Sequence, residues 1–268
     1  MEFSSHDIKA ISSRQNPFVE GLRELRDDPS DDLLFLEGPK LLAEALKSRL
    51  LIEKIAFVPA LLNTELIQAA CAVAKEKTQI TPYVLKGLSD VETPQGVIAI
   101  TRKPATDWKR LLDQFPRPIV ILDGIQNTGN AAAIVRTAEA AGAAGLITTP
   151  GSARLFSPKA LRGAMGSSLR LPILEHMDSA VIANHLQTAH YGILSSTSPS
   201  ASSLIYTQVE WSKAWAVVLG QEGQGVSSTW ADKQHVAVHI PMVSSVESLN
   251  VAAAAAILLY EARRWRQD

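Results

Sequence analysis

The chain has little that would tie it to a membrane, an oxidising compartment or a metal ion. Its 268 residues include one cysteine, Cys71, with no Cys or His partner at metal-binding spacing, which excludes internal disulfides and zinc sites made of several cysteines. No apolar run approaches the roughly 20 residues that span a bilayer, and the first ten residues lack the pattern of a signal peptide. We therefore expect a cytoplasmic protein with no membrane partner, no metal and a buried, unreactive Cys71 thiol.

Net charge is nearly absent as well. The formal charge is −1, so the chain lacks the overall basic charge that usually accompanies nucleic-acid binding. The local distribution differs, because no acidic residue lies between Glu139 and Glu175. This interval holds four basic residues, Arg154, Lys159, Arg162 and Arg170. They form either a solvated basic face or a surface that binds RNA phosphates.

The length allows two domains, and 46% hydrophobic with 20% charged residues is the composition of an ordinary globular protein. Residues 1–103 alternate patterns typical of helices (Pro17–Arg26, Pro39–Lys47, Thr64–Glu76) and of strands (Leu33–Leu36, Ile52–Val58, Gly96–Thr101). Residues 104–116 contain prolines and read as a linker. Residues 117–268 alternate strands and helices, which predicts a mostly parallel sheet with helices on both faces. The predicted fold class is α/β.

Three segments rich in glycine, proline and asparagine stand out in the second domain. They are Asn127–Arg136, Gly220–Gly225 and Ile240–Asn250, and each follows an apolar run that predicts a buried strand. The carboxyl ends of parallel strands meet at one edge of a sheet, where α/β folds build ligand sites. We therefore expect the three segments to form one site.

The glycine segment, Gly220-Gln-Glu-Gly-Gln-Gly225, excludes the commonest phosphate-rich ligands. Its spacing is neither that of the dinucleotide-binding fingerprint nor that of a P-loop. The carboxylate of Glu222 would repel a pyrophosphate, which favours a neutral or cationic ligand, and S-adenosylmethionine fits that description. The alternative is a tight turn with a solvated Glu222.

In the first segment, Asn130 is predicted to cap a helix that runs to Ala141, with Gly142 ending it. Arg136 lies within this helix among alanines. Its side chain either pairs with Glu139 three residues on or reaches the strand ends, where a guanidinium can hold a phosphate or orient a hydroxyl.

In the third segment, Pro241 ends a strand and leaves backbone groups of residues 240–243 free to meet an adenine ring. Asn250 or Ser248 is predicted to cap the last helix. Its alanine run, Ala252–Ala256, is either simply a strong helix former or a smooth face for close helix packing.

The order of these three segments resembles the SpoU (TrmH-like) RNA ribose 2′-O-methyltransferases of the SPOUT superfamily. The resemblance covers roughly residues 117–266 and includes Ser157–Gly166, which is similar to the segment after the family's first motif. The N-terminal unit, with Asn16-Pro-Phe-Val and Phe35-Leu-Glu-Gly-Pro, is similar to the L30e-like substrate-binding domain of many members.

The resemblance implies a C-terminal trefoil knot that binds S-adenosylmethionine, a homodimer, no metal, and a structured RNA substrate. Residues that match the family's catalytic positions are Arg136, Asn130, Glu222, Ser248 and Asn250. Those that match its cofactor-binding loops are Leu219, Gly220, Glu222, Gly223, Ile240, Pro241, Met242, Ser248 and Leu249. The expected RNA-binding residues are Arg14, Arg154, Lys159, Arg162 and Arg170. Gln221 departs from the family, where asparagine is commoner.

The implied reaction is attack of a ribose 2′-oxygen on the methyl carbon of the cofactor. Family proposals make the residue matching Arg136 the base, yet arginine keeps its proton in proteins. Arg136 can instead orient the nucleophile and stabilise negative charge on it, while a phosphate or water accepts the proton. The L30e-like unit favours ribosomal RNA. The alternatives are transfer RNA and a non-catalytic RNA-binding protein of ribosome assembly with the same fold.

Overall fold

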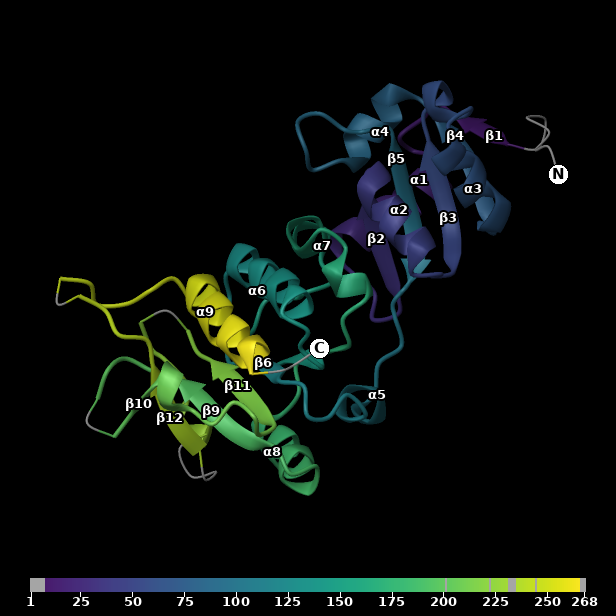
Figure 1. Ribbon diagram of the computed structural model, residues 1–268. Helices are drawn as coiled ribbons and strands as arrows, with labels where there is room; N and C mark the ends of the chain where they lie inside the picture. Colours follow the sequence, from purple (N-terminus) through teal and green to yellow (C-terminus); the bar gives the residue numbers. More distant parts are fainter. Residues whose placement is uncertain (1–7, 201, 222, 231–234, 244, 266–268) are drawn as a thin grey trace. The chain divides into compact units, whose positions relative to one another are not determined.

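The structure, a computed structural model, describes residues 8–200, 202–221, 223–230, 235–243 and 245–265 (Figure 1). Contacts divide the chain into two compact units, which we describe separately. The first comprises Met1–Pro104 and Phe156–Leu169, and the second comprises Ala105–Leu155 and Arg170–Asp268. The segment Phe156–Leu169 thus groups with the first unit, although it lies in the stretch that the sequence assigned to the second domain.

The first unit is built on a five-stranded sheet with strand order β1-β4-β3-β5-β2. β3 pairs in parallel with β4, and β4 in parallel with β1, while β5 runs antiparallel to both β3 and β2. The strands are β1 (Lys9–Ile11), β2 (Leu33–Glu37), β3 (Ile52–Phe57), β4 (Glu76–Ile80) and β5 (Val97–Arg102). The three strands predicted from sequence are present, and β1 and β4 are additional.

Helices connect these strands: α1 (Pro17–Asp27), α2 (Pro39–Lys47), η2 (Pro59–Leu61), α3 (Glu65–Val73) and α4 (Pro82–Leu88), with α7 (Pro158–Ala164) and η3 (Ser167–Leu169) from the later segment. The prediction that the third helix continues to Glu76 was wrong. The helix ends at Val73, and the amide of Lys75 donates to the carbonyl of Ile52. Sheet pairing with β3 therefore overrides the local helical pattern at this point.

Cys71 lies on α3 and is 2% exposed. Burial raises the pKa of its thiol, because an apolar environment disfavours the charged thiolate. The buried, unreactive cysteine expected from the sequence is consistent with this position.

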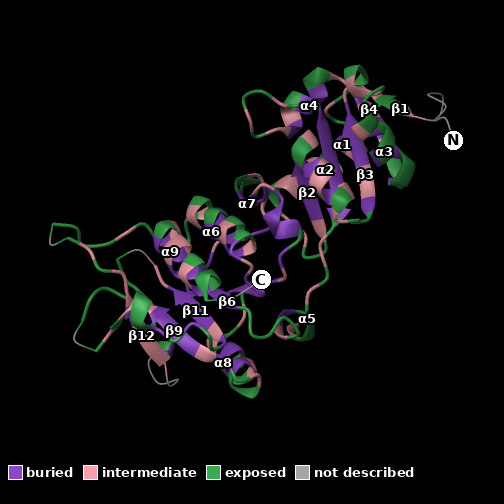
Figure 2. Cartoon of the chain, in the orientation of Figure 1, coloured by how far each residue is buried: buried purple, intermediate pink, exposed green. Residues whose placement is uncertain are grey.

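The second unit contains a seven-stranded sheet with the order β10-β12-β9-β11-β6-β7-β8. Every neighbouring pair in it is parallel, as predicted. The strands are β6 (Ile119–Leu122), β7 (Gly145–Thr148), β8 (Ile173–Leu174), β9 (Gly192–Ser196), β10 (Leu204–Ile205), β11 (Trp215–Leu219) and β12 (His235–His239). The central strands are buried almost throughout (Figure 2), because helices cover both faces of a parallel sheet.

The remaining helical segments of this unit are α5 (Trp108–Leu112), α6 (Thr128–Ala140), α8 (Ser179–Thr188), η4 (Tyr206–Gln208), η5 (Ser228–Trp230) and α9 (Val251–Arg264). α5 lies inside the stretch predicted to be a linker. Leu111 on α5 packs in one cluster with Ile119, Ile147 and Trp230. In the described part of the chain, no helix is long and apolar enough to cross a membrane.

Candidate active site

The candidate site lies where the loops after β6 and β11 diverge. The two strands are adjacent and parallel, with Leu122 opposite Leu219 at their carboxyl ends. β6 is followed along the chain by β7 on one side of the sheet, whereas the segment after β11 leads to β12 on the other side. A crevice opens at such a switch point in a parallel sheet and is where α/β proteins bind ligands. The first two predicted segments therefore meet as expected.

The first segment starts α6, but its cap differs from the prediction. The N-cap is Asn127, whose Oδ1 accepts from the amide of Asn130 at 3.0 Å. The expectation that Asn130 caps the helix was wrong, since the helix begins three residues earlier than expected. Its end is as predicted, with Gly142 at φ +76° just after the C-cap. The side chain of Asn130 is consequently available for contacts outside its own helix.

The third segment delivers such a contact. Asn250 caps α9, and its Oδ1 accepts from the amides of Ala252 at 3.0 Å and Ala253 at 3.4 Å. Its Nδ2 donates to Oδ1 of Asn130 at 3.1 Å. Of the two predicted caps, Asn250 is the residue that caps α9. Ser248, two residues earlier, is exposed. The starts of α6 and α9 are thus joined by a pair of amide side chains.

Small residues allow α6 and α9 to pack together. Ala131 and Ala138 on α6 and Ala254 and Ala255 on α9 are buried, and the guanidinium of Arg263 donates to the last carbonyl of α6, that of Ala140. The alanine run therefore lies in a well-formed helix and also supplies part of a smooth packing face.

The glycine segment forms a closed loop. The amide of Gln221 donates to the carbonyl of Gly225 at 3.0 Å, and the reverse hydrogen bond measures 2.9 Å. A Cβ at Gly220 would lie 2.1 Å from the carbonyl carbon of Gly225, so only glycine fits there. Gly223 and Gly225 have φ of +87° and +71°, values that L side chains rarely adopt. Glu222 itself lies outside the described residues.

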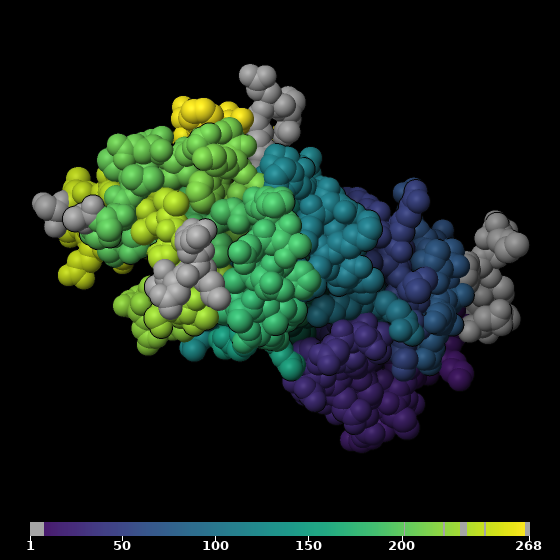
Figure 3. Space-filling view, turned by 90° about the horizontal axis from the view of Figure 1, so that it is seen from below, coloured from purple at the N-terminus to yellow at the C-terminus, as the bar shows by residue number. Residues whose placement is uncertain are grey.

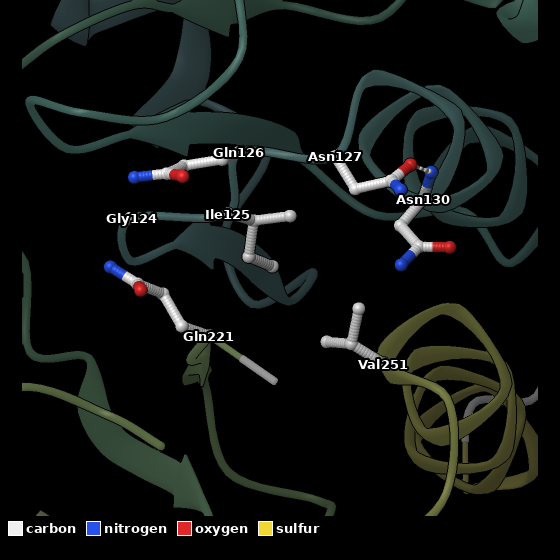
Figure 4. A pocket seen from close by; sticks show the side chains of 7 residues that line it. All are labelled: Gly124, Ile125, Gln126, Asn127, Asn130, Gln221 and Val251. Carbon is white, nitrogen blue, oxygen red and sulfur yellow. Dashed lines mark hydrogen bonds between the residues drawn. The ribbon is translucent and has the colours of Figure 1, made fainter. Parts of the chain in front are cut away.

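Two cavities flank this loop. One, of about 200 Å³, is lined by residues 124–127, Asn130, Gln221 and Val251. In Figure 4, Val251 at the start of α9 points toward Asn130 on α6, and Gln126 and Gln221 lie along the other side. The second cavity, of about 310 Å³, is lined by Asp123, Thr149, Gln221 and Ser227, among others. Gly124 and Gln221 line both.

Asp123, at the end of β6, is a site residue that the sequence reasoning missed. Its side chain is buried, with the residue 7% exposed, and the side chain accepts from the Thr149 hydroxyl at 3.0 Å and the Ser227 amide at 2.7 Å. A carboxylate directly after an apolar strand run and directly before a glycine was the signal that could have pointed to it, because buried charges in proteins carry specific partners.

Arg136 is exposed on α6. The i+3 ion pair considered for it does not form, because Glu139 is held by Arg170, with Nε to Oε1 at 2.6 Å and Nη2 to Oε2 at 2.8 Å. Among the residues that the structure describes, Arg136 makes no ion pair or side-chain hydrogen bond. The structural alternative for this arginine is therefore not observed.

The predicted cofactor-binding residues fall on three stretches of chain. Leu219 is the buried end of β11, followed by Gly220 and the exposed Gly223. Ile240 and Met242 are half-buried just after β12, with Pro241 exposed between them, and Leu249 is half-buried before α9. In the space-filling view, the later parts of the chain, light green to yellow, come together on the surface of the second unit (Figure 3).

The predicted RNA-binding residues have varied surroundings. Lys159 is exposed on α7, and Arg154 is exposed after β7. Arg162 pairs with Glu37 at 3.2 Å, within the first unit. The other two also have partners. Arg170 donates twice to Glu139, and Arg14 donates twice to the Tyr83 carbonyl and lies 3.9 Å from the centre of the Tyr83 ring. Their contact with RNA stays a prediction.

Comparison with known proteins agrees with this geometry. Residues 117–260 match the model of the SpoU rRNA methylase family, and residues 16–99 match an MRM3-like substrate-binding domain. The structure is similar to the crystal structure of an AdoMet-bound rRNA methyltransferase from Sinorhizobium meliloti, with a TM-score of 0.84, 26% identity, and coverage of 97% of this chain and 99% of that one. The fold is therefore that of an α/β methyltransferase of the SPOUT type.

Curated sequences give the same result. The chain is 27% identical to the 23S rRNA (guanosine(2553)-2′-O)-methyltransferase RlmP of Bacillus subtilis, over 96% of this chain and all of that protein. It is 32% identical to an uncharacterized tRNA/rRNA methyltransferase of Synechocystis sp., over 96% of this chain and 94% of that protein. The chain belongs to the SpoU rRNA methylase family. Its class of enzyme, a methyltransferase, and its methyl donor, S-adenosylmethionine, follow from that membership.

Proposed function

We propose that this enzyme transfers a methyl group from S-adenosylmethionine to a ribose 2′-hydroxyl of ribosomal RNA. The observation that carries the proposal is the Asn130–Asn250 hydrogen bond at 3.1 Å, beside a cavity that Gln221 of the glycine loop also lines. This bond joins the first and third motif segments, and the pairing of β6 with β11 brings the second segment to the same switch point of the sheet. Two relatives are named as methyltransferases that act on 23S ribosomal RNA at a ribose 2′-oxygen, and these names support the same reaction.

The residues of the site fit S-adenosylmethionine. Among the described residues that line the two cavities, none is lysine or arginine, which suits a ligand without phosphates. Amide side chains and backbone amides are present instead, and they can hold ribose hydroxyls and an adenine edge. We assign cofactor binding to the backbone and side chains around Leu219, Gly220, Glu222, Gly223, Ile240, Pro241, Met242, Ser248 and Leu249.

The bound cofactor supplies an electrophilic methyl carbon on a positively charged sulfur, which leaves as a neutral thioether. The protein's part is to align the ribose oxygen and assist the loss of its proton. Alignment of two reactants contributes on the order of 7 kcal/mol or more in favourable cases. Asn130 and Asn250 fix each other's orientation, and we assign them the positioning of the nucleophile, together with Ser248 and Glu222.

Arg136 is assigned to the developing oxyanion. Its exposed guanidinium makes no ion pair in the described part of the chain, and a protonated arginine can donate to the 2′-oxygen as charge builds on it. An RNA phosphate or a water molecule then accepts the proton, because arginine does not lose its own. This assignment makes Arg136 an orienting cation rather than a general base.

The proposal includes a homodimer in the cytoplasm, where the ribosomal RNA substrate is found. Tyr260 on α9 and Trp265 after it are 52% and 50% exposed, and large exposed apolar side chains of this kind often mark a subunit interface. Light scattering on the purified protein gives the mass directly. A monomeric mass at micromolar concentration would contradict this part of the proposal.

The test of the activity is methyl transfer by the purified full chain. Ribosomal RNA from cells that lack the gene is incubated with labelled S-adenosylmethionine, and ribose methylations are mapped. We expect one new 2′-O-methyl nucleotide, formed about 10² to 10³-fold more slowly with Arg136→Ala, and no label in transfer RNA. Label in transfer RNA alone would favour the alternative substrate. Cofactor binding without transfer to either RNA would favour a non-catalytic role in ribosome assembly.

A further inference from the structure

The strongest observation outside the predicted motifs is the setting of Asp123. Its backbone amide donates to the carbonyl of Leu219 at 2.9 Å, and its Oδ2 accepts from the amide of Ser227 at 2.7 Å. Leu219 is the last residue of β11, and Ser227 directly precedes η5. One residue thus holds the chain on both sides of the glycine loop, residues 220–225.

The hydrogen bonds within the glycine loop do not hold it to the sheet. The pair between Gln221 and Gly225 closes the loop on itself, but it does not fix the loop relative to the sheet. Asp123 provides that link, since it follows β6, whose last residue Leu122 is paired with Leu219. Hydrogen bonds to an ionised acceptor are about twice as strong as neutral ones, which suits a residue that must hold a loop.

A second set of hydrogen bonds holds Asp123 in place. The Thr149 hydroxyl donates to Oδ1 of Asp123 at 3.0 Å and accepts from the amide of Gly124 at 3.0 Å. Ser152 accepts from the same amide at 3.1 Å and donates to the carbonyl of Leu122 at 3.0 Å. These hydroxyls come from the turn after β7, so the ends of β6, β7 and β11 share one buried polar network.

Gly124 connects this network to the cavities. Its φ is +70°, and a Cβ there would lie 2.4 Å from Nε2 of Gln221. The side chain of Gln221 therefore lies against the backbone that Thr149 and Ser152 fix. A change at Asp123 would reach both cavities through this contact, since Gly124 and Gln221 line both.

We infer that Asp123 is a positioning residue for the methyl donor: it holds the glycine loop in the shape that binds S-adenosylmethionine, without touching the reacting atoms. The inference rests on the proposed function only for the identity of the ligand. A loop that is fixed before the ligand arrives binds more tightly, because the apparent dissociation constant rises as the population of the competent shape falls. Loss of Asp123 should therefore act on cofactor affinity first.

The test compares Asp123→Ala and Asp123→Asn in the full-length protein, with binding of S-adenosylmethionine measured by calorimetry. We expect Asp123→Ala to raise the dissociation constant about ten- to a hundred-fold, the factor that a hydrogen bond to a charged group is worth. Asp123→Asn keeps an oxygen that can accept from the Ser227 amide but loses the charge, so we expect it to recover part of the affinity. The exposed Asp113→Ala, at the C-cap of α5, serves as the matched control.

Kinetics separate positioning from a merely structural role. At saturating cofactor, kcat of Asp123→Ala should return to within a few-fold of wild type and KM for RNA should not change. Equal loss of affinity in the Ala and Asn variants, an unchanged dissociation constant, or a fall in kcat alone would overturn the inference.

Two further results keep the inference testable. If Asp123→Ala does not fold, Thr149→Val removes one donor to the same carboxylate and should raise the dissociation constant by a smaller factor. An unchanged constant there would count against the inference. Wild-type protein that binds S-adenosylmethionine but methylates no ribosomal RNA contradicts the proposed function, while the affinity comparison for Asp123 still stands.

Discussion

The side chains of Asn130 and Asn250 form a hydrogen bond of 3.1 Å between residues 120 positions apart in the sequence. Each also lies at the start of a helix: Asn130 in the first turn of α6, and Asn250 as the cap of α9. The oxygen of Asn250 serves its own helix while its nitrogen serves Asn130. The oxygen of the Asn250 amide therefore stabilises the start of α9, while its nitrogen faces the candidate site.

This division can be tested with Asn250→Asp. The carboxylate keeps the oxygen that caps α9 but has no N–H to donate to Asn130, so we expect stability within about 0.5 kcal/mol of wild type. Activity should fall at least about tenfold, as one directed hydrogen bond in the site is lost. Thermal unfolding and methyl-transfer rates measure the two effects separately.

Two companion variants serve as controls. Asn250→Ala removes the cap as well and should cost about 1 kcal/mol of stability in addition to activity. Asn130→Ala should match the activity of Asn250→Asp, and the double variant should be no worse than either, because both remove the same hydrogen bond. Additive losses would show that the two residues act independently.

Arg136→Ala should separate catalysis from stability most clearly. The side chain is exposed and makes no ion pair within the described residues, so the unfolding free energy should change by less than about 0.5 kcal/mol. The loss of an oxyanion donor should lower kcat about 10² to 10³-fold. Arg117→Ala, another exposed arginine of the second unit, is the control, and equal rates for the two variants would remove Arg136 from the mechanism.

Arg136→Lys tests how the guanidinium acts. A lysine keeps the charge but loses the planar set of donors, so we expect partial activity. A wild-type rate that titrates above neutral pH, with the titration moved to lower pH in the lysine variant, would favour proton transfer at this position. Parallel pH–rate profiles support an orienting cation.

The helix caps show most clearly which features could be predicted from the sequence and which could not. The motif spacing correctly predicted that a helix follows β6, because Asn, Thr and Gly before an alanine run form a strong helix start. It did not identify Asn127 as the cap, since Asn127 and Asn130 are both good caps locally. Only the position of α9 in the fold shows that the side chain of Asn130 contacts Asn250 instead of capping α6.

Long-range partners explain most of what was missed. No acidic residue lies between Glu139 and Glu175 in the sequence, yet Arg162 meets Glu37 and Arg170 meets Glu139 in the fold. Asp123 gave a weak signal for the same reason, because its partners Thr149 and Ser227 lie 26 and 104 residues away. Pattern and propensity are local, whereas these contacts depend on which strands become neighbours.

Cys71 gives a prediction about pH. Burial raises the pKa of its thiol, so between the ordinary pKa of a cysteine and this raised value the folded state keeps a proton that the unfolded state loses. Stability therefore falls as pH rises through that window. Cys71→Ser should abolish this part of the dependence, as followed by urea unfolding. We also expect iodoacetamide to modify Cys71 at least about tenfold more slowly in native than in unfolded protein.

Arg162 and Lys159 lie on the same short helix, α7, and should behave differently. Arg162 pairs with Glu37, whose side chain is 4% exposed and also accepts from the hydroxyl of Ser89. Arg162→Ala leaves that buried carboxylate short of a partner and should cost about 1–3 kcal/mol of stability. Lys159 is exposed, so Lys159→Ala should leave unfolding unchanged.

For RNA binding, we expect the opposite ranking: Lys159→Ala should have the larger effect and Arg162→Ala the smaller one. If Lys159 contacts a phosphate, its loss should weaken binding and reduce the slope of log affinity against log salt by about 0.7 to 0.9. For Arg162→Ala, we expect the slope to stay at the wild-type value under conditions in which the variant is folded, because its guanidinium is already bound to Glu37. Filter binding at four or five salt concentrations measures both slopes. A reduced slope for Arg162→Ala alone would mean that Arg162 leaves Glu37 for the RNA, and that the first unit rearranges on binding.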